Sequence, residues 1–139
     1  FLMGAIGATL GGYLCDKLQI RYGVKWGHRI PIIIGLVPSA GFLIFGSITE
    51  NPYLAVLSLS LCYGFIELTE GPFWSAIGFV SKKPQAAGGI LNTGGNLGGV
   101  LATPLIPIMA DQFGWMIALN SGVFFALLGV FAFMQIKFE

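Results

Sequence analysis

The chain has 139 residues, of which 55% are hydrophobic and only 9% are charged, whereas roughly a quarter of the residues in a soluble domain are charged. A soluble fold of this size exposes too much of its area to hide so much apolar surface, so the composition excludes a soluble globular domain. The net charge of +1 is nearly balanced, but the charges are segregated along the chain. The composition therefore predicts an integral membrane protein.

Five apolar segments follow one another, and we expect each of them to be a membrane-crossing helix. They cover residues 1–15, 30–48, 53–80, 85–110 and 115–136. The first is shorter than the ~20 residues that a crossing needs, and no strand-like alternation competes with the helical assignment. A first helix that lacks its beginning predicts that residues 1–139 are one partial domain of a longer polypeptide.

The basic residues predict the orientation of these helices. All seven lysines and arginines lie in three short segments, residues 17–29, 82–83 and 137. A chain that crosses back and forth brings these segments to one side, and the opposite turns carry only Glu50 and Asp111. Because basic residues gather on the cytoplasmic side, we expect a multi-pass protein of the plasma membrane, here a bacterial inner membrane, with a cytoplasmic C-terminus.

Two carboxylates lie within the third apolar segment, where each costs roughly 2.5–3.5 kcal/mol on insertion scales. Glu67, Glu70, Gly71 and Trp74 recur at helical spacing and share one stripe, which Gly71 and Pro72 are expected to bend. Intramembrane carboxylates usually face a water-filled path or a partner. The two carboxylates therefore either take part in a site for substrate or protons, or form a structural polar contact with a further helix.

The fourth segment is rich in glycine and contains two asparagines. Asn92 and Asn96 share a helical face with Gly95 and Gly99, and these two glycines form a small-xxx-small pair that favours close helix packing. An amide within a membrane span needs partners and suits a ligand that carries hydroxyl or carboxylate groups. Asn92 is therefore a candidate ligand contact. The glycine run lacks the Lys-Ser/Thr ending of a phosphate loop.

A polar loop is expected to join the first two segments over residues 16–29. Asp16 at a helix C-terminus opposes the helix dipole, so we expect it to have a partner, either an arginine or the N-terminus of another helix. His28 in this loop is expected to be solvated. The sequence contains no histidine–cysteine cluster and no catalytic set, so we expect no metal, no cofactor and no enzymatic activity.

Several motifs resemble those of a known family. Gly12, Asp16 and Lys17 form a Gly-x-x-x-Asp-Lys pattern at a helix end, which resembles the loop motif of the major facilitator superfamily. The basic residues that should follow directly arrive only after a longer loop, at Arg29. Residues 70–74 (EGPFW), 92–99 (NTGGNLGG) and 113–115 (FGW) look like the anion:cation symporter branch of that family.

The resemblance covers essentially the whole chain and implies an all-α membrane fold of twelve helices in two halves. This chain would supply transmembrane helices 8 (partial) to 12, in the C-terminal half, with substrate held between the halves near the midplane. The implied function is secondary transport of a small organic anion or sugar acid, such as a hexuronate or an aldonate, by alternating access with a coupled proton. The alternative is a non-transporting membrane scaffold or sensor subunit, whose polar residues only pair helices.

The resemblance also implies roles for particular residues. Trp74 and Asn92 match positions that line the sugar-acid site, with Gly71 and Asn96 beside them, and the coupling or tuning role would fall to Glu70 or Glu67. The cytoplasmic gate motif comprises four residues, Gly12, Asp16, Lys17 and Arg29. The implied partners are the substrate, a coupling proton, the lipid bilayer and the missing N-terminal half of the same polypeptide, and no nucleic acid.

Overall fold

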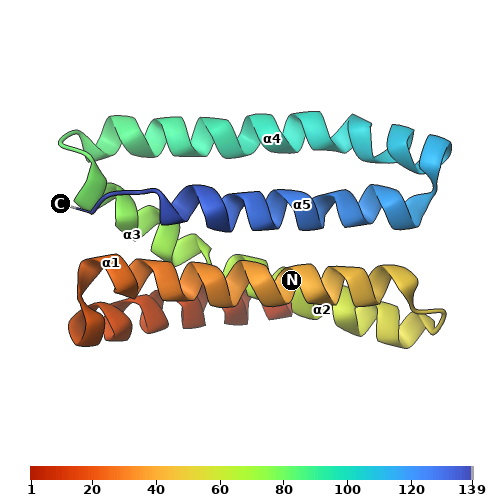
Figure 1. Ribbon diagram of the computed structural model, residues 1–139, viewed down its shortest axis with the longest axis horizontal. Coiled ribbons are helices and arrows are strands. Elements are labelled where there is room, and N and C mark those ends of the chain that lie inside the picture. Colours follow the sequence, from red (N-terminus) through yellow and green to blue (C-terminus); the bar gives the residue numbers. More distant parts are fainter. Residues whose placement is uncertain (139) are drawn as a thin grey trace.

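The computed structural model describes residues 1–138, and within them all regular secondary structure is helical. The elements are α1 (Leu2–Ile48), α2 (Pro52–Glu67), α3 (Glu70–Val80), α4 (Pro84–Phe113) and α5 (Trp115–Met134). Three stretches are long and apolar enough to cross a membrane, Leu2–Ile48, Pro52–Val80 and Trp115–Met134. The helices extend along one common direction (Figure 1), and many large apolar side chains are exposed on their outer faces. The prediction of an all-α membrane protein is confirmed.

The helix α1 reverses its direction at Gly23, so that its two arms fold back on each other (Figure 1). The backbone of Gly23 has φ 79° and ψ 169°, a conformation that glycine adopts without the steric cost of a side chain. The arms meet near the reversal, because a Cβ on Gly27 would lie 2.5 Å from the Cα of Gln19. The predicted irregular loop over residues 16–29 is therefore wrong, since these residues are helical except at Gly23.

The third apolar segment is broken into α2 and α3 at Leu68 and Thr69. Pro72 explains the break, because it has no N–H to donate to the Leu68 carbonyl four residues earlier and its ring crowds that carbonyl. The Thr69 hydroxyl donates to the Ile66 carbonyl at 2.7 Å and supports the turn. The break lies one turn before the predicted bend. Glu67, at the end of α2, is thus not on the same continuous helix as the residues of α3.

The α1–α2 and α4–α5 turns lie at the end of the molecule opposite the reversal of α1 (Figure 1) and follow local sequence rules. The Asn51 side chain accepts hydrogen bonds from the backbone N–H groups of Tyr53 and Leu54, at 2.9 and 3.4 Å, and so caps α2. Pro52 follows as the first helical residue, where its missing N–H costs nothing. Gly114, with φ 87°, joins α4 to α5.

Glycines allow α2 to pack closely against the first arm of α1. A Cβ on Gly7 would lie 2.9 Å from the carbonyl carbon of Gly64, and one on Gly11 would lie 2.7 Å from that of Leu68. These two carbonyls are one helical turn apart, so both glycines face the same side of the C-terminal end of α2, where Leu68 is the C-cap. Close backbone approach through small residues is the usual way in which helices associate in lipid.

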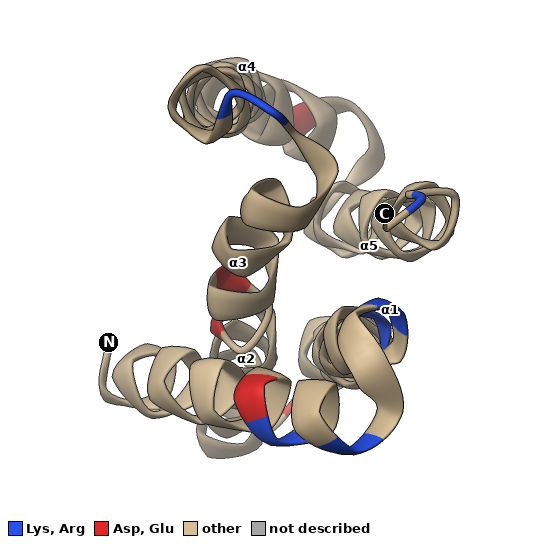
Figure 2. Cartoon of the chain, turned by 90° about the vertical axis from the view of Figure 1, so that its left-hand side faces the viewer, with Lys and Arg blue, Asp and Glu red and all other residues tan. Residues whose placement is uncertain are grey.

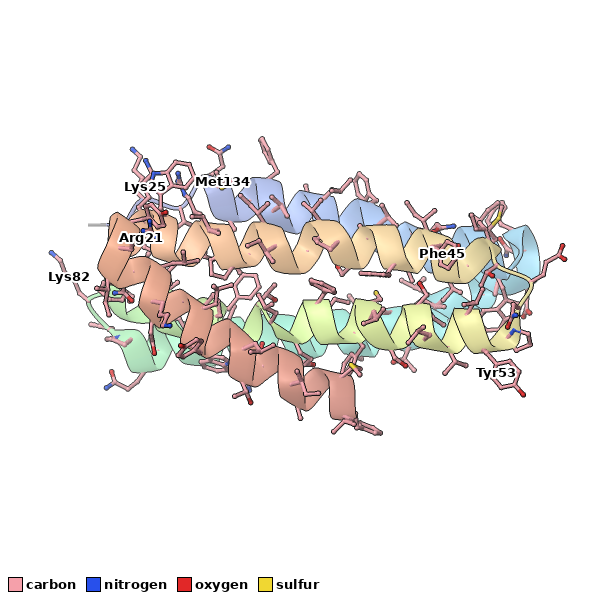
Figure 3. The ribbon with its side chains drawn as sticks, turned by 90° about the horizontal axis from the view of Figure 1, so that it is seen from below. Arg21, Lys25, Phe45, Tyr53, Lys82 and Met134 are labelled. Carbon is pink, nitrogen blue, oxygen red and sulfur yellow. The ribbon has the colours of Figure 1, made fainter. Side chains whose placement is uncertain are left out.

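The basic segments gather at one end of the bundle. Figure 2 looks at this end and shows the lysines and arginines of α1, of the α3–α4 turn and of the C-terminal segment around it. Figure 3 places Arg21, Lys25 and Lys82 at this end and Tyr53 at the opposite one. We call it the basic end. A small buried core lies between α1, α3 and α5, and consists of Ile32, Leu36, Ala76 and Phe133.

Candidate functional site

Two grooves lie side by side between α3 and α4, with Trp74 and Asn92 in the lining of both. The groove nearer the α3–α4 turn has a volume of about 590 Å³ and includes Gln85 and Gly88. The other has a volume of about 370 Å³ and includes four of the predicted substrate or coupling residues, namely Glu70, Trp74, Asn92 and Asn96, together with the predicted packing residue Gly95. Both volumes fall within the range of small-molecule sites.

Trp74 and Glu70 form a fixed pair on α3. The indole Nε1–H donates to Glu70 Oε1 at 3.1 Å, as positions one helical turn apart allow. This bond uses the only donor of the indole. Trp74 therefore offers apolar ring atoms to the groove, and the Glu70 carboxylate keeps acceptor positions for a further donor.

The two asparagines of α4 differ in how much hydrogen-bonding capacity they leave free. Asn96 Nδ2 donates to the Asn92 backbone carbonyl at 2.8 Å, so its side-chain oxygen is the part left for other donors. The Asn92 side chain makes no hydrogen bond within residues 1–138 and is exposed. A free amide offers two donors and one acceptor. Asn92 is thus able to bind hydroxyl or carboxylate groups in the groove.

Two other predicted site residues lie away from the groove lining. Gly71 packs against the first arm of α1, because a Cβ there would lie 3.0 Å from both the Cα and the N of Gly12. Glu67 is the last residue of α2 and is only partly exposed. The two carboxylates of the third segment therefore have different surroundings, and of these only Glu70 lines one of the two grooves described above.

The predicted packing glycines of α4 face open space in this structure. A Cβ on Gly95 or Gly99 would meet nothing within 4 Å among the described residues. Their packing role stays a prediction, which needs a helix beyond those described here. The close contacts occur instead at Gly7 and Gly11, which sequence reasoning missed although they have the same small-xxx-small spacing.

The predicted gate residues are not assembled into one cluster. Asp16 is exposed and forms no hydrogen bond or ion pair with another residue in the range 1–138, so the partner that we expected for it remains a prediction. Lys17 instead lies over the Tyr13 ring, with Nζ 4.6 Å from the ring centroid. Gly12 serves as the flat surface against which Gly71 packs.

Arg29, the fourth gate residue, binds the end of α5. It is 9% exposed, and its Nη2 donates to the backbone carbonyls of Met134 and, at 3.1 Å, Ile136. The last carbonyls of a helix lack partners within the helix, and a cation there also interacts favourably with the helix dipole. Arg29 therefore caps α5 in this structure.

His28 is fully buried, with 0% exposure, so the prediction that it is solvated is wrong. Its Nδ1 is 2.7 Å from the Val24 carbonyl and its Nε2 is 3.0 Å from the Ser75 hydroxyl. The ring packs between Phe79 and Phe138, with centroids 5.3 and 5.2 Å away. Local polarity suggested a loop, but His28 joins α1, α3 and the C-terminal segment.

Comparison with known proteins gives several relatives, although the chain matches no family model. A probable sulfoacetate transporter of Cupriavidus necator is 31% identical over an alignment of 115 positions that covers 81% of this chain and 27% of that protein. A D-galactonate transporter of Escherichia coli is 27% identical over an alignment of 141 positions that covers 96% of the chain and 31% of that protein. Monocarboxylate transporter 12 of Mus musculus is 27% identical over an alignment of 120 positions that covers 81% of the chain and 22% of that protein.

These relatives are all transporters of the superfamily whose motifs the chain resembles. The chain spans about a quarter of their length, from 22% to 31%. The similarity extends over most of the chain and agrees with the helical membrane architecture. The chain is therefore homologous, over most of its length, to transporters of the major facilitator superfamily.

Proposed function

We propose that the protein containing this chain transports a small organic anion of the sugar-acid type, such as a hexuronate or an aldonate, by alternating access coupled to a proton. The observation that carries the proposal is the groove in which Glu70, Trp74, Asn92 and Asn96 meet. The names of two relatives, a sulfoacetate and a D-galactonate transporter, support the class of substrate.

In this proposal the chain forms part of the C-terminal half, as transmembrane helices 8 to 12, and an N-terminal half of the same polypeptide faces the groove. The basic end would lie in the cytoplasm of a bacterial cell, together with the C-terminus. The gathering of the basic segments at one end of the bundle supports this orientation.

The polar groups in the groove suit a polyhydroxylated molecule. The free Asn92 amide can donate to one hydroxyl and accept from another. The Trp74 ring offers apolar atoms against which the C–H groups of a carbon chain or ring can pack. Glu70, held in place by the indole N–H, can accept from a further hydroxyl.

The negative charge of the proposed substrate would favour protonation of the Glu70 carboxylate. An ionised carboxylate about 6 Å from an anionic substrate would repel it by about 3 kcal/mol at an effective dielectric constant of about 20, which is roughly a hundredfold in affinity. Uptake of a proton by Glu70 removes this repulsion while the anion is bound. A cation supplied by the other half would balance the charge of the substrate itself.

The proton-coupling step can be tested with two matched glutamine variants in the transporter that contains this chain. Glu70→Gln should keep exchange of labelled for unlabelled substrate but lose proton-driven accumulation, because its amide can still accept from the indole but cannot bind a proton. Glu67→Gln removes a carboxylate that lies outside the groove lining and should keep both activities. Proton-driven accumulation by Glu70→Gln at the wild-type rate would refute the coupling role.

The substrate contacts can be tested in the same assay. Asn92→Ala should weaken uptake of a sugar acid about tenfold or more, because loss of a hydrogen-bonding side chain leaves substrate groups unpaired. Thr103→Ala is the control, because Thr103 lies on the same helix and its hydroxyl donates only to the Gly99 carbonyl. No uptake of any sugar acid by the wild type would instead favour a scaffold or sensor.

A further inference from the structure

The reversal of α1 carries a mixed basic and apolar surface to which the proposed transport site assigns no role. We call residues 17–26 the reversal segment. Three of its apolar side chains are exposed, by 88%, 50% and 46%, namely Ile20, Tyr22 and Trp26. Three of its cationic side chains are also exposed, namely Lys17, Arg21 and Lys25. Figure 3 places Arg21 and Lys25 at the outer edge of the basic end.

Two of the three cations of this segment lie over aromatic rings. Arg21 lies over Tyr22, with Cζ 5.3 Å from the ring centroid, and Lys17 lies over Tyr13. Within residues 1–138 none of these cations forms an ion pair with a carboxylate. Such contacts hold the cationic groups near a ring but leave their N–H donors available to an anion.

The depth of the segment matches the headgroup layer of a bilayer. The apolar part of the second arm begins at Ile30, and at 1.5 Å per residue Trp26 lies about 6 Å and Gly23 about 10 Å beyond it. The hydrocarbon core is about 30 Å thick and the bilayer with its headgroups about 40–45 Å. Trp26 thus lies where aromatic side chains gather at membrane surfaces, and the cations lie at the level of the phosphates.

We propose that the reversal segment binds the headgroups of anionic phospholipids. Arg21 and Lys25 would contact the phosphates, while Ile20 and Trp26 would enter the boundary with the acyl chains. An exposed segment that combines basic and large apolar side chains at this depth has the composition of an interfacial lipid-binding element. The proposal does not depend on the substrate or on the direction of transport.

The first experiment counts bound lipids on the purified protein that contains this chain, by native mass spectrometry in an equimolar mixture of phosphatidylglycerol and phosphatidylcholine. The wild type should retain phosphatidylglycerol preferentially, and R21Q/K25Q should lower this preference at least threefold. K82Q/K83Q is the matched control, because it removes the same charge from the α3–α4 turn at the same end. It should keep the preference, as should the charge-conserving variant R21K/K25R.

A second measurement keeps the wild-type cations in place. A bimane fluorophore attached to Ile20→Cys, with other reactive cysteines replaced, should be quenched more strongly by brominated phosphatidylglycerol than by brominated phosphatidylcholine. Equal quenching, or an equal loss of preference in R21Q/K25Q and K82Q/K83Q, would overturn the proposal in favour of diffuse attraction. No preference for phosphatidylglycerol in the wild type would also overturn it, and would indicate that a carboxylate of another segment pairs with these cations.

Discussion

The contact between α1 and α2 makes Gly11→Ala the most informative stability variant. A Cβ on Gly11 would lie 2.7 Å from the carbonyl carbon of Leu68, whereas an ordinary contact between carbon atoms is about 3.5–4.0 Å. The obstacle is backbone rather than a flexible side chain, so α2 must move away by about 1 Å. Overpacking of this kind typically lowers the free energy of unfolding by about 1–3 kcal/mol, and for Gly11→Ala we expect a loss in the upper part of that range.

The neighbouring residue provides the control. A Cβ on Gly12 would meet nothing within 4 Å among residues 1–138, and alanine is about 1 kcal/mol more favourable than glycine within a helix. Gly12→Ala should therefore be neutral or slightly stabilising. Thermal unfolding in detergent, followed by the fluorescence of a thiol probe that reacts with the buried Cys15 and Cys62, compares the two variants directly.

A double variant tests the geometry more closely. Gly7 and Gly11 face carbonyls on the same side of the C-terminal end of α2, so one outward movement of α2 would relieve both clashes. The loss of stability in Gly7→Ala/Gly11→Ala should therefore be smaller than the sum of the two single losses. If Gly11→Ala is as stable as Gly12→Ala, or if the two losses add fully, the close packing described here is not what holds these helices together.

Two further variants test the cap of α5 and the break before α3. Arg29→Gln should lower the free energy of unfolding by about 2 kcal/mol, because it removes charge-assisted hydrogen bonds to backbone carbonyls. Amide hydrogen exchange in residues 134–138 should become faster. Lys25→Gln is the control, because Lys25 is an exposed neighbour, and it should leave this exchange unchanged. Pro72→Ala restores an N–H that can donate to the Leu68 carbonyl. Hydrogen exchange at this new amide should be slow, because α2 and α3 would then form one helix. Fast exchange there would show that another residue causes the break.

The features that the sequence predicted correctly depend on composition and on local rules. Apolar content and segment length predicted the helical membrane class. Alternate crossings were enough to predict that the three basic segments lie at one end. None of these inferences required knowledge of which helices touch.

The features that the sequence did not predict depend on contacts between distant residues or on a neglected local rule. His28 is buried by Ser75, which is 47 positions away, and Arg29 binds a carbonyl 105 positions away, so nothing nearby in the sequence signals their burial. The polar stretch over residues 16–29 indicated exposure, but lysine, glutamine and arginine are also good helix formers. The break before α3 was predictable, because Pro72 always frees the carbonyl four residues earlier.

The two walls of the groove are held to different degrees, and this bears on how the proposed site would work. α3 is fixed at three points: His28 bonds to Ser75, Gly71 packs on Gly12, and Phe73 packs against Phe133 with ring centroids 5.3 Å apart.

The other wall, α4, contacts α3 and α5, and its residues 89–101 are exposed. Trp74 and Glu70 therefore have positions set by this chain alone, whereas the position of Asn92 also depends on what packs against α4. A groove with one fixed wall and one adjustable wall can close on a ligand by movement of α4 alone. For this reason we expect substrate to protect the α4 side of the groove from modification more strongly than the α3 side. Cysteines at positions 91 and 77 serve as the reporters, because Leu91 and Ile77 line the grooves but are not among the proposed substrate contacts.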